Sequence, residues 1–185
     1  MKYFLSLLIF LIFFGFAPRD KDRSIPWSPR QLTWADFQGK PHPRSNVGAV
    51  TYSGMRYSFE GNSNAYNITV VATFDPERSW VNKKAANNHV LRHEQLHFDI
   101  TELYARKMRA ALKKISPGTQ KPDVAASKLY NRYTNESREY QDRYDHETDH
   151  SRNEAKQAFW DKKITGELAA LDHEAGTVIT ITARR

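Results

Sequence analysis

The sequence contains no cysteine, and this absence limits the chemistry available to the chain. Without thiols the chain forms no disulfides, offers no thiolate ligands to zinc and carries no N-terminal cysteine for lipidation. Any bound metal ion must therefore be held by histidine and carboxylate side chains. The absence does not decide the cellular compartment, because many exported proteins also lack cysteine.

Long runs of basic residues are also missing, although the chain has a net charge of +7 and a pI of about 9.6. Scattered lysines and arginines are typical of a solvated surface, whereas a nucleic-acid site gathers them into a patch. We therefore expect no nucleic-acid partner. The 185 residues, 39% hydrophobic and 26% charged, suit one globular domain with its own core.

Long apolar runs are confined to the start of the chain. Residues 1–17 place one lysine ahead of an apolar run from Tyr3 to Phe16, and Ala17 ends the segment. This pattern predicts a secretory signal peptide, because a membrane span needs about 20 apolar residues. Pro18 disfavours cleavage after Ala17, so a retained N-terminal membrane anchor is the alternative. Both interpretations predict an exported domain, either periplasmic or secreted, with membrane contact only through this segment.

The rest of the chain divides into a lead-in and a folded domain. Residues 18–46 contain five prolines and are predicted to be irregular, and residues 47–185 are predicted to form the domain. Apolar residues alternate from Val47 to Glu60 and again from Tyr66 to Phe74, around the turn residues Gly61–Asn64. Two alternating runs around a short Gly/Asn loop predict an antiparallel hairpin.

Three helices and a last strand follow. The first helix is predicted to begin near Ser79 or Asn82 and to run to about Lys114, and the second covers about Asp123 to Tyr144. A third is predicted over residues 153–171, and residues 177–183 alternate like a strand that joins the hairpin. The predicted fold class is α+β, with a small antiparallel sheet packed on a long helix and with further helices.

The first helix carries the strongest chemical signal. His93-Glu94-Gln95-Leu96-His97 is an H-E-x-x-H pattern, and residues four apart share one face of a helix. Both imidazoles can then reach one metal ion, while Glu94 lies where a carboxylate could activate a metal-bound water. The simpler alternative is a pair of solvated histidines, but the flanking residues are mostly apolar. This favours a metal site.

A second cluster lies near the end of the second helix. His146-Glu147-Thr148-Asp149-His150 has the same letters, but its inner position Asp149 carries a charge that a helix buried beside a metal would not normally hold. We therefore assign the catalytic role to the first motif. A catalytic zinc site has three protein ligands and an open position. The third ligand is expected from this cluster, with His150, His146, Glu147, Asp149 and Asp145 as candidates.

Three segments in order resemble a known family. They are Leu32-Thr33-Trp34-Ala35-Asp36-Phe37, the motif from His93 to Asp99, and Tyr144-Asp145-x-x-Thr148-x-His150. Together they resemble a family of predicted secreted zinc-dependent proteases of zincin-like character that is catalogued as a domain of unknown function. The resemblance covers roughly Trp27 to Trp160. In that family the late motif usually ends in His-Gly, which implies His150 as the third zinc ligand. Here Ser151 stands in place of the glycine.

The sequence thus predicts a zincin-like, zinc-dependent metalloprotease that acts on a peptide or protein. His93, His97 and His150 hold Zn²⁺, while Glu94 takes a proton from the zinc-bound water and passes it to the leaving amine. Tyr144 is a candidate for stabilising the oxyanion, with a packing role as the alternative. Two other functions remain open: a zinc-dependent amidase acting on cell-wall peptides, and a non-catalytic zinc-binding exported module. The sequence predicts neither the substrate's identity nor the oligomeric state.

Overall fold

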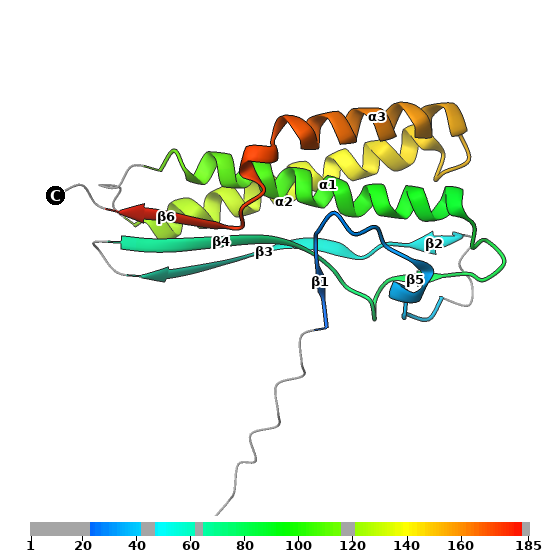
Figure 1. Cartoon of the computed structure of the whole chain (residues 1–185), viewed down its shortest axis with the longest axis horizontal. Coiled ribbons are helices and arrows are strands. Elements are labelled where there is room, and N and C mark those ends of the chain that lie inside the picture. Colours follow the sequence, from blue (N-terminus) through cyan, green and yellow to red (C-terminus); the bar gives the residue numbers. More distant parts are fainter. Residues whose placement is uncertain (1–22, 42–46, 62–64, 116–120, 183–185) are drawn as a thin grey trace, which may run out of the picture.

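The computed structural model describes residues 23–41, 47–61, 65–115 and 121–182. The predicted signal peptide and part of the lead-in lie outside these residues. Figure 1 shows an antiparallel sheet on one side and three helices on the other. The helix α1 (Asn88–Leu112) contacts the sheet strands β3 and β4 as well as the helices α2 and α3. This arrangement confirms the α+β class and places the predicted motif helix at the centre of the molecule.

The main sheet is built around one hairpin. Strand β3 (Ser53–Gly61) pairs antiparallel with β4 (Ala65–Phe74), as predicted. Alternate residues of β4, from Tyr66 to Phe74, are buried against the helices, which is why this segment reads as a strand with one apolar face. The strands β1 (Ile25–Pro26) and β6 (Val178–Thr182) pair with the two ends of β4, opposite β3.

The predicted first strand is longer than any strand observed there. Residues 49–50 form a separate strand, β2 (Ala49–Val50), which pairs with β5 (Trp80–Val81). Tyr52 lies between β2 and β3, and its backbone N–H donates to Ser79 Oγ while its oxygen accepts from the N–H of Asp75. The strand pairing of residues 80–81 also explains why α1 begins later than the sequence suggests.

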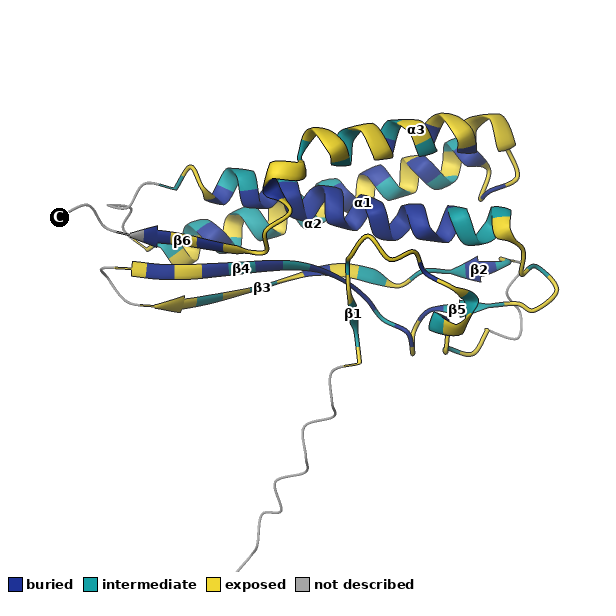
Figure 2. Cartoon of the chain, in the orientation of Figure 1, coloured by how far each residue is buried: buried dark blue, intermediate teal, exposed yellow. Residues whose placement is uncertain are grey.

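Helix α1 begins at Asn88, directly after its N-cap residue Asn87. The side chain of Asn87 accepts a hydrogen bond from the backbone N–H of Val90 at 2.9 Å, which satisfies one of the free donors of the first turn. The predicted start at Ser79 or Asn82 was therefore wrong by about two turns, and the helix ends at Leu112 rather than Lys114. From His93 onwards nearly every residue of α1 is buried, as Figure 2 shows.

The remaining helices agree more closely with the sequence. Helix α2 (Pro122–Thr148) runs one turn beyond the predicted end at Tyr144, and its tyrosines pack towards the core as expected. Helix α3 (Glu154–Ala170) matches the prediction within a residue, and a short 3-10 helix, η2 (Asp172–Glu174), leads to β6. Strand β6 joins the hairpin sheet as predicted. No helix among the described residues is long and apolar enough to cross a membrane.

The described part of the Pro-rich lead-in is mostly irregular and packs against the domain. It forms β1 and a 3-10 helix, η1 (Trp34–Asp36), and it places Leu32 and Phe37 in the core. The backbone N–H of Leu32 donates to Gln95 Oε1 at 2.7 Å, and the indole of Trp27 donates to Asp99 Oδ1 at 3.0 Å. The lead-in therefore supports α1 from the side opposite the histidines.

Candidate metal centre

His93 and His97 face the same point beside α1. Their Nε2 atoms lie 3.3 Å apart, and the two rings are nearly perpendicular at 87°. Both residues are buried, at 4% and 9% exposure. A helix places residues i and i+4 on one face, so this geometry follows directly from the spacing of the motif. The structure thus brings together the two residues that the sequence predicted as metal ligands.

Asp145 of α2 completes the group. Its Oδ1 atom lies 3.0 Å from His93 Nε2 and 2.9 Å from His97 Nε2. Among the described residues, His93, His97 and Asp145 form a cluster that could hold a metal ion. Bonds of about 2.0–2.1 Å at tetrahedral angles place ligand atoms about 3.3 Å apart, close to the three separations seen here. Two imidazoles and one carboxylate therefore fit a single divalent ion.

The other nitrogen of each imidazole is also engaged. His93 Nδ1 lies 3.0 Å from Gln157 Oε1, and His97 Nδ1 lies 2.9 Å from Gln141 Oε1. An amide oxygen only accepts hydrogen bonds, so each Nδ1 must carry the proton. When Nε2 gives up the proton that it shares with Asp145, the proton on Nδ1 remains and the Nε2 lone pair becomes available, which is the tautomer that metal binding requires.

Asp145 dominates the electrostatics of the cluster. Burial alone would lower the pKa of His97, but the hydrogen bond and the charge of Asp145 outweigh burial and raise that pKa to about 9. Burial opposes ionisation of Asp145, yet the hydrogen bonds from His93 and His97 hold its pKa well below the usual range. The site thus stabilises positive charge at the point where the three side chains meet.

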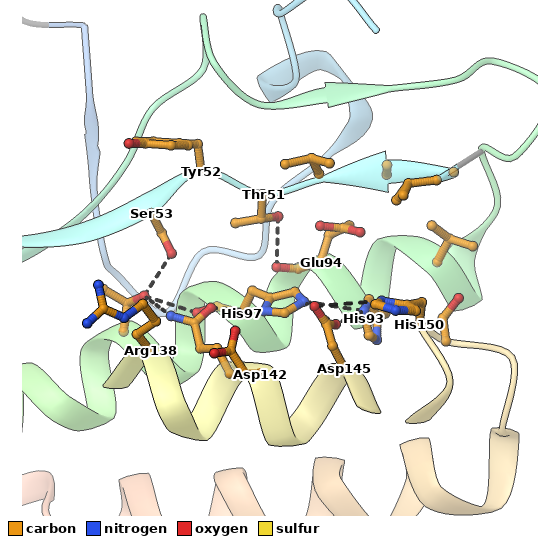
Figure 3. A pocket seen from close by; sticks show the side chains of 18 of the residues that line it. Thr51, Tyr52, Ser53, His93, Glu94, His97, Arg138, Asp142, Asp145 and His150 are labelled. Carbon is orange, nitrogen blue, oxygen red and sulfur yellow. Dashed lines mark hydrogen bonds and ion pairs between the residues drawn. The ribbon is translucent and has the colours of Figure 1, made fainter. Parts of the chain in front are cut away.

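Glu94 lies beside the cluster in a cleft of about 1060 Å³. Its side chain projects from α1 towards the strand segment above it, and the Thr51 hydroxyl donates to the Glu94 backbone oxygen at 3.1 Å (Figure 3). The Glu94 carboxylate has no hydrogen-bond partner within the described ranges, although the residue is only 4% exposed. An unpaired carboxylate beside a metal site is suited to act as a general base.

The cleft runs between a strand segment and a helix. Residues 47–55, which include β2 and the start of β3, line one wall, and α2 supplies the other wall with Arg138, Asp142 and Asp145. Figure 3 shows His93, Glu94 and His97 between these walls, with Asp145 reaching over from α2. The candidate metal centre is therefore open to solvent along an elongated cleft rather than enclosed.

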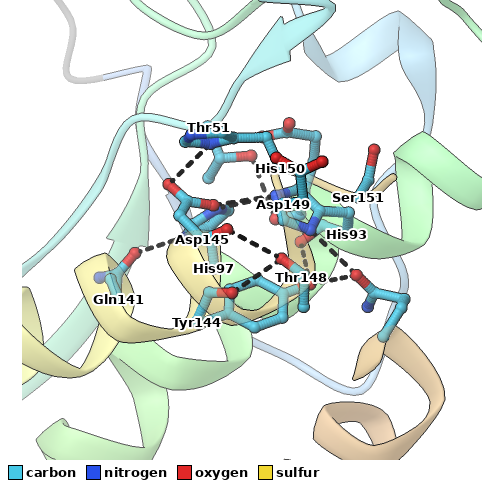
Figure 4. A network of polar contacts seen from close by, with 12 residues as sticks. Thr51, His93, His97, Gln141, Tyr144, Asp145, Thr148, Asp149, His150 and Ser151 are labelled. Atoms are coloured by element: carbon cyan, nitrogen blue, oxygen red, sulfur yellow. Dashed lines mark hydrogen bonds and ion pairs between the residues drawn. The ribbon is translucent and has the colours of Figure 1, made fainter. Parts of the chain in front are cut away.

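The structure places His150 next to the cluster rather than inside it. Its Nδ1 lies 3.7 Å from Asp145 Oδ2, and the side chain is 57% exposed at the edge of the cleft. Figure 4 shows His150 on the loop after α2, beside Asp145. The assignment of His150 as third ligand stays a prediction, and Asp145, one of the alternatives in the same cluster, is the residue that directly contacts both histidines.

Tyr144 is buried behind the cluster. Its ring stacks on His93 at 4.6 Å, and its hydroxyl lies 2.9 Å from Gln157 Oε1 and 3.3 Å from the His93 backbone oxygen (Figure 4). Burial raises the pKa of this phenol well above its ordinary value. The hydroxyl is therefore engaged away from the cleft. This geometry favours the packing alternative over an oxyanion role.

The second histidine motif is not a helical H-E-x-x-H. Helix α2 ends at Thr148, and Asp149, His150 and Ser151 all have positive φ angles of 50°, 51° and 74°. His146 and His150 consequently do not share one helical face. Glu147 instead accepts a hydrogen bond from the Trp160 indole at 3.1 Å. These contacts agree with the assignment of the first motif as the chemical one.

Two residues of the site were missed by sequence reasoning. Gln141 lies one helical turn before Asp145 on α2, so its position on the same face could have been inferred from the spacing. Gln157 comes from α3, and no signal in the sequence marks it among the other polar residues of that helix. Its role appears only when α3 packs against α1 and α2.

A comparison with protein-family models gives one match, over residues 40–151. This range covers more than half of the chain and contains the H-E-x-x-H helix, Asp145 and His150. No curated protein and no solved structure matches the sequence, so the zincin-like character of the fold stays a prediction. The matched model is described as "Bacterial protein of unknown function (DUF922)", and the chain belongs to this family.

Proposed function

We propose that the protein is an exported zinc-dependent metallopeptidase. The observation that carries the proposal is the convergence of His93 Nε2, His97 Nε2 and Asp145 Oδ1 within 3.3 Å of one another, beside Glu94 in an open cleft. Nitrogen and carboxylate donors in this number suit zinc and leave one coordination position for water or substrate.

The roles of the side chains follow from their positions. His93, His97 and Asp145 would hold the zinc ion, which would supply a Lewis acid that acidifies water. Glu94 takes the proton of the attacking water and delivers it to the leaving amine, because its carboxylate is unpaired and close to the ligands. A purely structural zinc site would not need this carboxylate, which favours a hydrolase over a non-catalytic zinc-binding module.

The strand wall of the cleft supports a peptide substrate. The backbone N–H and oxygen of Tyr52 hydrogen-bond Ser79 and Asp75, respectively. Backbone groups alternate in direction along a strand. Ser53, the first residue of β3, should therefore point its backbone groups the opposite way, towards α2. Met55 points that way as well, because its oxygen accepts from the Tyr130 hydroxyl at 3.0 Å. An extended peptide could pair with this edge and pass its scissile bond over the metal site.

The proposal is tested with the purified mature chain and an unfolded protein as substrate. We expect peptide release that stops with a chelator and returns with zinc. Glu94→Gln should bind zinc as tightly as the parent but cleave at least about 100-fold more slowly, the scale of general base catalysis. Cleavage by Glu94→Gln at the parent rate would refute the mechanism. Release from cell-wall peptides alone would indicate an amidase instead.

Export is part of the proposal and rests on residues 1–17 alone. A hydrolase of this type acts on material outside the cytoplasm if the segment directs export. Fractionation of cells that express the full chain, with and without residues 1–17, tests this point. Cytoplasmic recovery of the full chain would contradict it.

A further inference from the structure

The two imidazoles of the metal centre are held by a matched pair of glutamines. Gln157 of α3 accepts from His93 Nδ1 at 3.0 Å, and Gln141 of α2 accepts from His97 Nδ1 at 2.9 Å. The two amides come from different helices, and each contacts a different ligand. Neither contacts the point where the three ligand atoms meet. They are therefore partners of the ligands rather than ligands themselves.

Gln157 is oriented by a second donor. The Tyr144 hydroxyl lies 2.9 Å from the same Oε1 atom that faces His93. Two donors that converge on one oxygen favour the amide orientation in which Oε1, and not Nε2, faces the imidazole. Tyr144 also stacks on the His93 ring at 4.6 Å, so one side chain restrains both partners of the hydrogen bond.

This orientation leaves a buried donor without a partner. Gln157 is 3% exposed, and its Nε2 makes no hydrogen bond to any of the described residues. An unsatisfied buried amide group destabilises a protein, and such a group in a native structure calls for an explanation. Here the reason is available: the orientation that costs this hydrogen bond is the one that leaves His93 Nε2 free for a metal.

The chemistry of the partner also matters. The usual outer partners of zinc-binding histidines include carboxylates, which add negative charge and make the imidazole more basic. Both partners here are neutral amides and add no negative charge to the imidazoles. Of the three candidate ligands, Asp145 is the one that carries a negative charge. A divalent ion held by this set would keep a net charge of about +1 and with it much of its strength as a Lewis acid.

From these contacts we propose that Gln157 and Gln141 are positioning residues that fix both histidines as Nδ1–H tautomers, with Tyr144 orienting Gln157. The proposal rests on the metal site of the proposed function. It also makes α3 an obligatory part of that site, although α3 lies beyond residues 40–151, the range that the family model matches.

The test measures zinc affinity rather than turnover, by competition with a chromophoric chelator. Gln157→Met keeps the length of the side chain and removes the acceptor, and we expect zinc binding to weaken by about 10–100-fold. Gln141 lines the cleft, and Gln141→Met should weaken zinc binding by the same factor of about 10–100. Gln157→Glu restores an acceptor and should recover most of the affinity. Tyr144→Phe should fall between the parent and Gln157→Met.

Gln95→Met is the matched control. Gln95 is a buried glutamine of α1 that bonds Leu32 and Asp99 instead of a histidine, so the variant should lose stability and keep its zinc affinity. The ¹⁵N resonances of the imidazoles give an independent reading, since zinc-loaded parent protein should show protonated Nδ1 on both rings. Equal zinc affinity in the parent, Gln157→Met and Gln141→Met would overturn the proposal. Failure of the parent to bind zinc would instead overturn the metal site itself.

Discussion

Asp145 Oδ1 lies 2.9 Å from His97 Nε2, although the two residues come from different helices and are 48 positions apart. The contact joins α2 to α1 at the centre of the cleft. The same oxygen also lies 3.0 Å from His93 Nε2, so one carboxylate oxygen hydrogen-bonds both imidazoles. Zinc binding would replace these two hydrogen bonds with three coordinate bonds.

This arrangement predicts which residue is the third ligand. Asp145→Ala should weaken zinc binding by more than about 100-fold, a larger loss than the 10–100-fold expected for an outer partner. His150→Ala should change zinc affinity by no more than a few-fold, because the His150 side chain is 57% exposed and lies 3.7 Å from Asp145 rather than against the two histidines. Competition with a chelator measures both. Asp142→Ala is the control, since Asp142 is an exposed carboxylate of the same cleft wall. A larger loss for His150→Ala than for Asp145→Ala would restore the ligand set predicted from the sequence.

The raised pKa of His97 predicts how stability depends on pH when metal is absent. Its folded-state pKa is about 9, above the unfolded value near 6.5. The stabilisation is therefore complete below pH 6.5 and is lost as pH rises through 9. Since His97 is buried, a difference of this size corresponds to roughly 2–4 kcal/mol, counted once for the His97–Asp145 pair.

Thermal unfolding between pH 6 and 9.5 checks this dependence. With a chelator present, the melting temperature should fall across the interval, whereas zinc-loaded protein should show little change because its imidazoles are already neutral. Asp145→Asn removes the charge that raises the pKa and should flatten the metal-free curve. A metal-free parent that gains stability towards pH 9 would contradict the assignment.

The prediction from sequence succeeded where one local pattern decided the outcome. The alternation of Tyr66 to Phe74 fixes β4, and the spacing of His93 and His97 fixes their shared face. The prediction failed where a contact with residues far away in the sequence determines the structure. Residues 80–81 pair with β2 instead of starting α1, and only that pairing moves the helix start to Asn88. Gln157 joins the site through the packing of α3, which no spacing within the sequence encodes.

The backbone conformation of the loop after α2 favours glycine at position 151. Asp149, His150 and Ser151 all occupy the left-handed region, and Ser151 has a φ of 74°. Glycine adopts this conformation without steric cost, whereas other L-residues do so at roughly 1–2 kcal/mol. His89 Nε2 hydrogen-bonds the Ser151 backbone oxygen and holds the loop against α1. The glycine that the family resemblance implies at position 151 therefore fits the backbone conformation of this loop.

Ser151→Gly should accordingly stabilise the protein by about 0.5–1 kcal/mol, because relief of the left-handed strain outweighs the added freedom of the unfolded chain. Denaturant unfolding of zinc-free protein measures the change. Ser58→Gly, at an exposed position within β3, is the matched control and should destabilise by a similar amount. Destabilisation by Ser151→Gly would show that the serine side chain contributes more than the backbone strain costs.

The contact between Trp27 and Asp99 predicts that the lead-in stabilises α1 without taking part in metal binding. The indole donates to Asp99 Oδ1 at 3.0 Å, and burial raises the pKa of Asp99 in spite of this bond. Trp27→Phe removes the donor but keeps an aromatic ring, and we expect a loss of about 1–2 kcal/mol, since the bond reaches a buried carboxyl group. Denaturant unfolding measures the loss, and zinc affinity should not change. Trp34→Phe is the control, because the Trp34 indole N–H has no hydrogen bond within the described part of the chain. The Trp34 ring packs edge-on against Phe37, with 5.0 Å between ring centroids. Equal losses for both variants would mean that aromatic packing, and not the hydrogen bond to α1, anchors the lead-in.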